Sequence, residues 1–254
     1  MNAVLWIGGA GLGVGILYGL FGVGSAFATP MLVLLGVPVM AAVVGPLPAL
    51  LPGAATGAWS YARHRQVDWW VARRTIAGAL PAAVLGAIAS RWVGGPLLVA
   101  TSGVVLLAVG LRVLHPGAAA DRDPWAHRHP ALLVCSAVGI GFASGLLANG
   151  GGFLLVPLFL LVVGLEMSEA TGTSLVVAAV LTVPTLATHA IIGDIDWTIA
   201  GMFALGLVPG AHLGATLSRQ FATDRLRTAF GVLLVLFATW FLIRQLPALM
   251  TAIG

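Results

Sequence analysis

Residues 149–157 read NGGGFLLVP, and residues 22–30, at the corresponding place in the first part of the chain, read GVGSAFATP. In both stretches a run of small residues precedes apolar residues and a proline. Contiguous glycines leave the backbone free to bend and do not define the face of a helix. The sequence therefore predicts that a helix is broken at residues 22–25 and again at residues 149–152.

The composition places these breaks inside a membrane protein. Hydrophobic residues make up 59% of the chain, charged residues only 8%, and the mean hydropathy is +1.05, whereas a soluble domain carries about 25% charged residues. The apolar runs are long and do not alternate, which disfavours a β-barrel. The sequence predicts an all-α polytopic membrane protein whose first apolar segment, MNAVLWIGGAG, is not a removable signal peptide.

The apolar segments form two series of five, separated by the polar stretch HPGAAADRDPWAHRHP at 115–130. Their approximate ranges are 3–21, 26–37, 39–61, 70–90 and 96–114, then 131–148, 153–165, 171–192, 197–218 and 228–247. The series share landmarks in the same order: Asp68-Trp69 corresponds to Asp196-Trp197, and Pro81 to Pro209. A duplication explains this order, with a first membrane repeat at 1–114, a linker at 115–130 and a second membrane repeat at 131–254.

The arginines indicate that the two repeats are inverted. The loop before Asp68 is rich in arginine, the equivalent loop before Asp196 has none, and the loop at 219–227 reverses this difference. Because arginine is retained on the cytoplasmic side, we expect equivalent loops to lie on opposite sides of the plasma (inner) membrane. Every arginine except Arg91 and Arg244 then lies inside, the linker 115–130 is cytoplasmic, and both termini lie outside.

The second segment of each series is too short for an ordinary crossing. The segment at 26–37 reaches about 18 Å at about 1.5 Å per residue, whereas the hydrocarbon core is about 30 Å thick. We expect each repeat to contain a glycine-broken re-entrant or short helix pair plus three transmembrane helices. Five full crossings per repeat, in a thinned bilayer, are the alternative.

The two glycine breaks predict an anion site. Irregular backbone at membrane depth is tolerated where it is buried in protein or lines a wet cavity. The helix after each break begins with unpaired amide N–H groups and about +0.5 of an elementary charge. Inverted repeats bring both breaks to the midplane, where they would bind an anion without a buried cation. The expected residues are Gly22, Val23, Gly24, Ser25, Asn149, Gly150, Gly151 and Gly152. Close helix packing, as expected along Gly206, Gly210 and Gly214, is the alternative use of these glycines.

A third break is expected in EATGTSLVV, residues 169–177, which would open the third segment of the second repeat. Thr173 and Ser174 would add hydroxyl donors to the anion site. Prolines replace these hydroxyls in the first repeat, so the site should be asymmetric. Ordinary N-capping by Thr173 and Ser174 is the alternative.

The two glycine-rich turns, the GTSL run at 172–175, VDWW at 67–70 and IDWT at 195–198 together resemble the TauE/SafE family of sulfite exporters. The resemblance covers nearly the whole chain. It implies a transporter that exports sulfite or a small organosulfur anion such as sulfoacetate. The first turn departs from the family's glycine triplet, and Asn149 stands where a smaller or apolar residue is commoner. These departures concern the substrate more than the class of protein.

Three further residues are candidates for coupling or gating. His212 is expected deep within a segment, on the same face as the regularly spaced glycines there, where an ionisable side chain indicates function. His189 precedes Asp196 by the spacing that the family leads one to expect, and Tyr61 takes its place in the first repeat. A neutral His212 bonded to a helix carbonyl and an interfacial His189 are the alternatives.

These features favour a secondary transporter that binds sulfite or a small organosulfur anion and works by alternating access of the two repeats. An anion-selective channel, or a transporter of another small carboxylate or oxyanion, is the alternative. The sequence has no HExxH motif and no nucleophile elbow, so we expect neither an enzyme nor a metal or cofactor site. The expected partners are a small anion, the lipid bilayer and a coupling proton or sodium ion, with no nucleic acid; the oligomeric state is left open.

Overall fold

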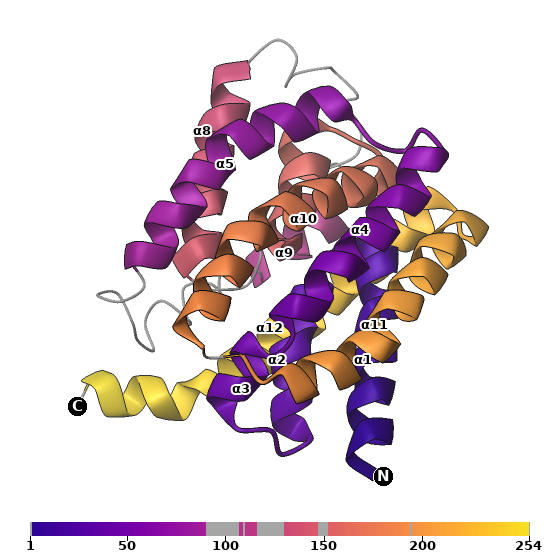
Figure 1. Cartoon of the computed structure of the whole chain (residues 1–254). Coiled ribbons are helices and arrows are strands. Elements are labelled where there is room, and N and C mark those ends of the chain that lie inside the picture. The colour runs from indigo at the N-terminus through magenta and orange to yellow at the C-terminus, as the bar shows by residue number, and fades with distance from the viewer. Residues whose placement is uncertain are drawn as a thin grey trace.

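The structure, a computed structural model, describes residues 2–89, 107–108, 110–115, 130–146, 152–193 and 195–253. This part of the chain is almost entirely helical and contains no strand. Its helices are α1 (Asn2–Phe21), α2 (Gly24–Leu34), α3 (Val39–Val44), α4 (Leu47–Arg63), α5 (Trp69–Ala89), α8 (Pro130–Leu146), α9 (Gly152–Leu158), η2 (Phe159–Val163), α10 (Met167–Ile192), α11 (Trp197–Leu217), η3 (Ser218–Gln220) and α12 (Thr223–Ile253) (Figure 1).

Several of these helices match the dimensions of a bilayer. By length and composition, the described spans that are long and apolar enough to cross one are Val4–Phe21, Ala41–Arg63, Met167–Ile191 and Trp197–Gln220. Shorter apolar helices occupy Gly24–Leu34, Pro130–Gly145 and Leu154–Val163. The prediction of a multi-pass all-α membrane protein is confirmed at this level, and so is the shortness of the second segment in each half.

The first glycine break is confirmed, and the third is wrong. α1 ends at Phe21 and α2 begins at Gly24, with Gly22 in the left-handed region at φ +71°. α10, in contrast, begins at Met167 with Glu166 as N-cap, so residues 172–174 lie inside the helix. Glycine is needed at 172 for a close contact, because a Cβ there would meet the Gln66 carbonyl and, at 2.7 Å, the Tyr61 Cβ.

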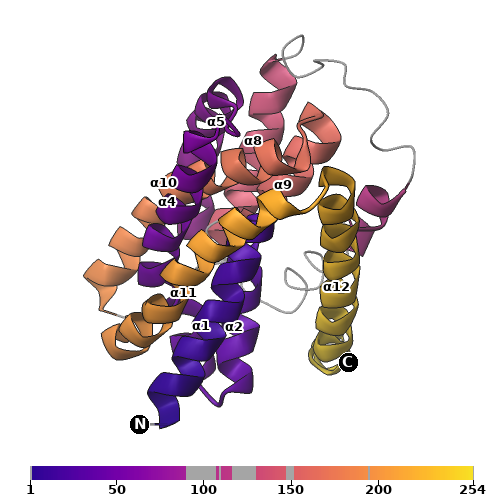
Figure 2. The same ribbon diagram turned by 90° about the vertical axis from the view of Figure 1, so that its right-hand side faces the viewer.

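α1 and α2 form a hairpin. They pack against each other, and Figures 1 and 2 show α2 returning beside α1 toward the end at which α1 begins. Gly24 lies against the Tyr18 side chain of α1, where a Cβ would clash. This arrangement is the one expected of a short helix pair that turns at the glycines.

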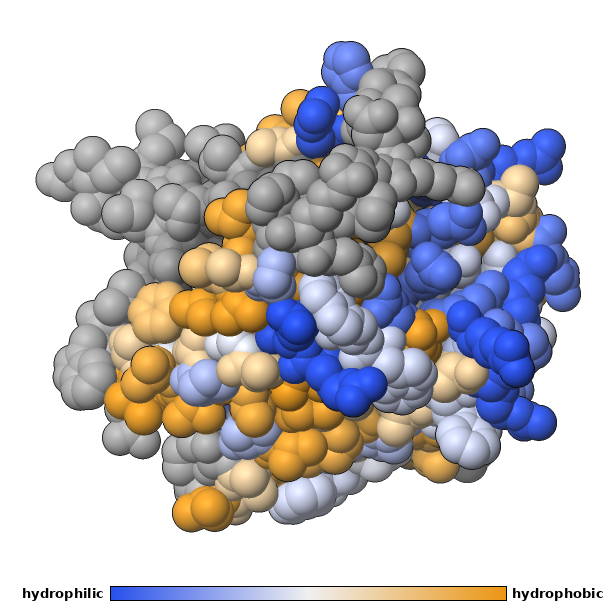
Figure 3. Space-filling view, turned by 90° about the horizontal axis from the view of Figure 1, so that it is seen from above, coloured by the Kyte–Doolittle hydropathy of each residue, from blue (hydrophilic) through white to orange (hydrophobic). Residues whose placement is uncertain are grey.

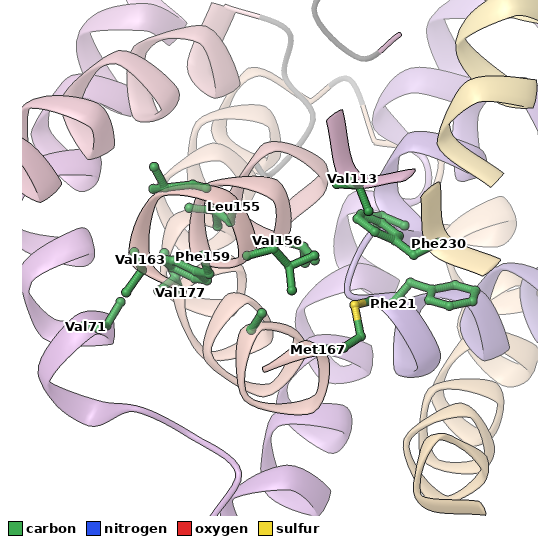
Figure 4. Packing of buried hydrophobic residues seen from close by; sticks show 14 of the residues in the cluster. Phe21, Val71, Val113, Leu155, Val156, Phe159, Val163, Met167, Val177 and Phe230 are labelled. Carbon is green, nitrogen blue, oxygen red and sulfur yellow. The ribbon is translucent and has the colours of Figure 1, made fainter. Parts of the chain in front are cut away.

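Two hydrophobic cores hold the described helices together. The first, here called the α1–α4–α11 core, also takes residues from α2 and α3, and its fully buried members include Leu47, Phe203 and Leu207. The second, the α5–α8–α10 core, also takes residues from α9 and α12, and Figure 4 shows several of its buried side chains, among them Val177 and Phe230. Each core therefore combines helices from both expected repeats.

The first helix of each expected repeat packs against the fourth helix of the other: α1 against α11, and α8 against α5. Glycine makes both contacts close, because a Cβ on Gly15 would meet the backbone of Leu207 and a Cβ on Gly141 would meet the backbone of Ala79. Ala79 and Leu207 each lie two residues before the corresponding prolines Pro81 and Pro209, so the two contacts involve equivalent positions of α5 and α11. The close helix packing expected along Gly206, Gly210 and Gly214 is thus confirmed, and glycines of α1 and α8 pack in the same way.

The third helices of the two halves, α4 and α10, run antiparallel. The Gly57 position near the end of α4 faces Leu175 near the start of α10, and Gly172 faces Tyr61. α4 and α11 run in the same direction, because Gly53 faces Leu207 and Tyr61 bonds to Ser218. The inversion of the two halves stays a prediction, and the antiparallel α4 and α10 agree with it.

Candidate functional site

The turn at Gly22 forms one wall of the candidate site. The Gly22 N–H donates to the Tyr18 carbonyl at 2.8 Å, which closes α1, and the left-handed backbone then redirects the chain into α2. A side chain at Gly22 would be strained by that φ and would also meet the Ser174 Oγ of α10 and the Val156 Cγ2 of α9, the latter at 2.9 Å. The turn is therefore in direct contact with two elements of the second half.

α10 forms the second wall with its hydroxyl residues. Ser174 donates from Oγ to the Thr171 carbonyl at 2.8 Å, and Thr173 accepts at Oγ1 from the Asp68 N–H at 3.0 Å. Thr171, Thr173 and Ser174 are all completely buried. Neither Thr173 nor Ser174 caps the helix, so the N-capping alternative for them is wrong: the helix begins too far upstream.

Two hydroxyls at this place have no hydrogen-bond partner among the described residues: Ser25 Oγ and Thr171 Oγ1. Ser25 is 2% exposed and lies in the first turn of α2, three residues after Gly22. Thr171 is 0% exposed, with its Cγ2 3.6 Å from the position of a Cβ on Gly22. An unsatisfied buried hydroxyl costs about 1–3 kcal/mol, so two of them beside one turn suit a polar guest.

The second glycine turn lies largely outside the described residues. This applies to Asn149, Gly150 and Gly151, as it does to most of the linker. Gly152 is the first residue of α9, and α9 contacts α2. Val156 packs against Gly22 from α9, so the helix that follows the second turn adjoins the first turn.

Around the site, no charged side chain is fully buried among the residues that the structure describes. Among the described residues, every buried polar side chain outside the tyrosines is a serine or a threonine. The arginines whose side chains are described are exposed or partly exposed. Arg219 Nη1 lies 2.6 Å from His64 Nδ1, so the loops after α4 and α11 lie at the same end of the molecule. Figure 3, which looks onto this end, shows hydrophilic residues gathered over part of it.

The structure corrects the position of His212 and specifies that of Tyr61. His212 is exposed, whereas the glycines at 206, 210 and 214 are buried against α1, so His212 does not share their face. α1 packs against the face of α11 that carries the glycines, and His212 lies on another, exposed face.

Tyr61 is buried and donates from its hydroxyl to the Gly19 carbonyl at 2.8 Å, with Ser218 Oγ also at 2.8 Å. His189 lies near the end of α10, partly buried.

Thr171 lies at the candidate site but was not among the residues expected from the sequence. It lies three residues before Ser174, which places both on one face of a helix, but the interpretation of this run as a helix break hid that spacing. The hydrogen bond between the Asp68 N–H and Thr173 Oγ1 was likewise not predicted from the sequence. No group of three potential metal ligands occurs among the residues searched, which are the described ones.

Known proteins resemble this chain over most of its length. The profile of the sulfite exporter TauE/SafE family matches residues 7–241. Two proteins named probable membrane transporter protein, from Xylella fastidiosa strains 9a5c and Temecula1, are 32% and 30% identical, each over 98% of both chains. The probable membrane transporter protein YjnA of Bacillus subtilis is 28% identical over 84% of this chain and 89% of its own. No solved structure matches the chain significantly.

Proposed function

The chain belongs to the TauE/SafE family of sulfite exporters and is a membrane transporter; from this premise we propose that it exports sulfite or a small organosulfur anion across the plasma membrane. The substrate binds at the turn of Gly22, Val23, Gly24 and Ser25, against Thr171, Thr173 and Ser174 of α10. The residues 149–152 complete the site from the second half.

The observation that carries this proposal is the pair of buried, unpartnered hydroxyls, Ser25 Oγ and Thr171 Oγ1. A hydroxyl donates one hydrogen bond, and the first turn of α2 adds backbone N–H groups and a positive partial charge. Oxyanions of sulfur accept several hydrogen bonds at once. A guest of this kind removes the cost of both unsatisfied groups and matches the sign of the helix end.

The way the helices are shared bears on which parts would move if the protein works by alternating access. The cores combine helices of both halves, so rocking the halves 1–114 and 131–254 as units would separate α1 from α11 and α5 from α8. We therefore assign the motion to the α1–α4–α11 core and the α5–α8–α10 core, which meet where α4 packs on α10. The antiparallel α4 and α10 support two inverted states of similar structure, one open to each side.

Flux in proteoliposomes tests the function. We expect the purified protein to move radiolabelled sulfite with a saturable rate that depends on an imposed proton or sodium gradient. Protein-free vesicles and vesicles with the Gly22→Val variant serve as controls. A rate that rises linearly with sulfite concentration and ignores both gradients would instead identify an anion channel. The absence of any flux of sulfite or short organosulfonates would contradict the proposal.

A further inference from the structure

The polar groups at the site are all neutral. Ser25, Thr171, Thr173 and Ser174 supply hydroxyls, and no described arginine is buried. Among the described residues, the positive potential at the turn comes from the first turn of α2, which is equivalent to about half an elementary charge. The site therefore offers hydrogen bonds in abundance but little countercharge.

A site with little countercharge distinguishes anions by their charge. The cost of removing an ion from water rises with the square of its charge, so a dianion costs about four times as much as a monoanion of the same size. Its attraction to the fixed partial charge at the helix end only doubles. The balance between these two terms therefore shifts against the second negative charge, however well the oxygens are hydrogen-bonded.

We infer that the site selects singly charged anions: hydrogensulfite over sulfite dianion, and monosulfonates over anions that carry two permanent charges, such as sulfate or sulfoacetate. This inference rests on the proposed function and specifies its substrate. Ser25 and Thr171 bind the anion in this inference, because their unpartnered hydroxyls replace the water that the anion loses.

Hydrogensulfite loses its proton near neutral pH, so the fraction of sulfite present as the monoanion falls as the pH rises. If only the monoanion binds, the apparent affinity for sulfite falls with rising pH even when no protein group titrates. The titratable side chains on or beside the elements packed around the site are Tyr18 on α1, Tyr61 and Arg63 on α4, Asp68 just before α5, and Glu169 and His189 on α10. Methanesulfonate controls for these groups, because its single charge does not change with pH.

Calorimetric titration of the purified protein with sulfite, methanesulfonate and sulfate tests the inference. Between about pH 6 and about pH 8, we expect the apparent Kd of sulfite to rise about tenfold for each pH unit above the pKa of hydrogensulfite. The Kd of methanesulfonate should stay constant, and sulfate should bind at least about tenfold more weakly than sulfite at the lower pH.

Single substitutions test whether the Ser25 and Thr171 hydroxyls bind the anion. Ser25→Ala and Thr171→Val should each weaken binding of sulfite at the lower pH by about tenfold, as expected when a hydrogen bond to a charged group is lost. Thr182→Val is the control, because Thr182 lies buried on the same helix but already donates to the Ala178 carbonyl. We expect this control to bind sulfite like the unaltered protein.

The outcomes separate the inference from the proposed function. Sulfate that binds as tightly as sulfite, a sulfite Kd that ignores pH, or a methanesulfonate Kd that rises in parallel would each overturn monoanion selection while leaving an anion transporter. Unchanged sulfite affinity in both hydroxyl variants would remove Ser25 and Thr171 from the site. No binding of any of the three anions would overturn the proposed function and this inference together.

Discussion

Gly22 and Gly36 share one backbone conformation and differ in what surrounds them. Their φ angles are +71° and +83°, so an alanine at either position costs about 1–2 kcal/mol of backbone strain. A Cβ at Gly22 would meet the Ser174 Oγ, whereas a Cβ at Gly36 would meet nothing within 4 Å. We expect Gly22→Ala to abolish most sulfite flux and Gly36→Ala to retain it, at equal membrane abundance. Equal flux through the two variants would show that the Gly22 turn does not line the route.

Tyr61 joins the ends of three helices through its hydroxyl, which contacts Gly19 of α1 and Ser218 after α11. Removing the Tyr61 hydroxyl takes a hydrogen-bond donor from the Gly19 carbonyl, so Tyr61→Phe should destabilise the protein by about 1–3 kcal/mol. Ser218→Ala should cost less when Tyr61 is already phenylalanine, since both variants lose the same contact. Thermal unfolding of the single and double variants in detergent measures this coupling, and simple additivity would contradict a shared hydrogen bond.

At the scale of single residues, the sequence predicted chemistry better than geometry. The small residues and hydroxyls at 22–25 and 173–174 were selected as candidates because they gather at runs that were expected to interrupt apolar helices. Thr171 and the burial of Tyr61 were not predicted, because both depend on contacts between distant segments. The exposed position of His212 was not predicted for a related reason. Spacing along a helix shows which residues share a face, but which faces are buried depends on where the neighbouring helices pack.

The packing of α1 against α11 is the most extensive contact between helices in the described part of the chain, and small residues create it. A Cβ on Gly15 would lie 2.9 Å from Leu207 Cα and 3.0 Å from Ala211 N. Gly13, on the exposed side of the same helix, would meet nothing within 4 Å. Gly15→Ala should therefore destabilise the protein by about 1–3 kcal/mol, measured by thermal unfolding in detergent. Gly13→Ala should be neutral or stabilising by up to about 1 kcal/mol, and a loss of the same size in both would contradict this packing.

The elements themselves were largely predictable, because long apolar runs between polar loops dictate helices in a membrane protein. α1, α5, α8 and α11 follow the expected ranges closely. The break of the third segment into α3 and α4 at Gly45-Pro46 and the early start of α10 at Met167 were not expected. Propensity alone does not reveal that Gly172 serves a close approach to Gln66 and Tyr61 and that the helix continues through it.

For the whole molecule, the account requires the two ends of α11 to face opposite sides of the membrane, with the arginine-bearing end inside. Thr198 lies at the start of α11 and Gln220 in η3 just after its end, and both are exposed. In a Cys135→Ala background, which removes the single cysteine, Gln220→Cys should react with an impermeant thiol reagent only from the cytoplasmic side. Thr198→Cys should react only from outside. The opposite pattern would overturn the inverted orientation derived from the arginines.

The exchange of helices between the two cores is a property of the whole molecule that the sequence did not reveal. Duplication predicted two equivalent halves and suggested that they move against each other. The pairing of α1 with α11 and of α5 with α8 depends on how the halves interlock, and no periodicity along the chain encodes that choice. The consequence is that the moving bodies we propose do not coincide with the sequence repeats.

The central claim is that a sulfur oxyanion binds beside the Gly22 turn, on the hydroxyls of Ser25 and Thr171. Crystals of the protein soaked in selenite, which has the shape and charges of sulfite, would test it through the anomalous scattering of selenium. We predict a selenium peak within hydrogen-bonding reach of Ser25 Oγ and Thr171 Oγ1, and its loss in the double variant Ser25→Ala, Thr171→Val. Selenium bound only elsewhere, with those hydroxyls still unpartnered, would contradict the account.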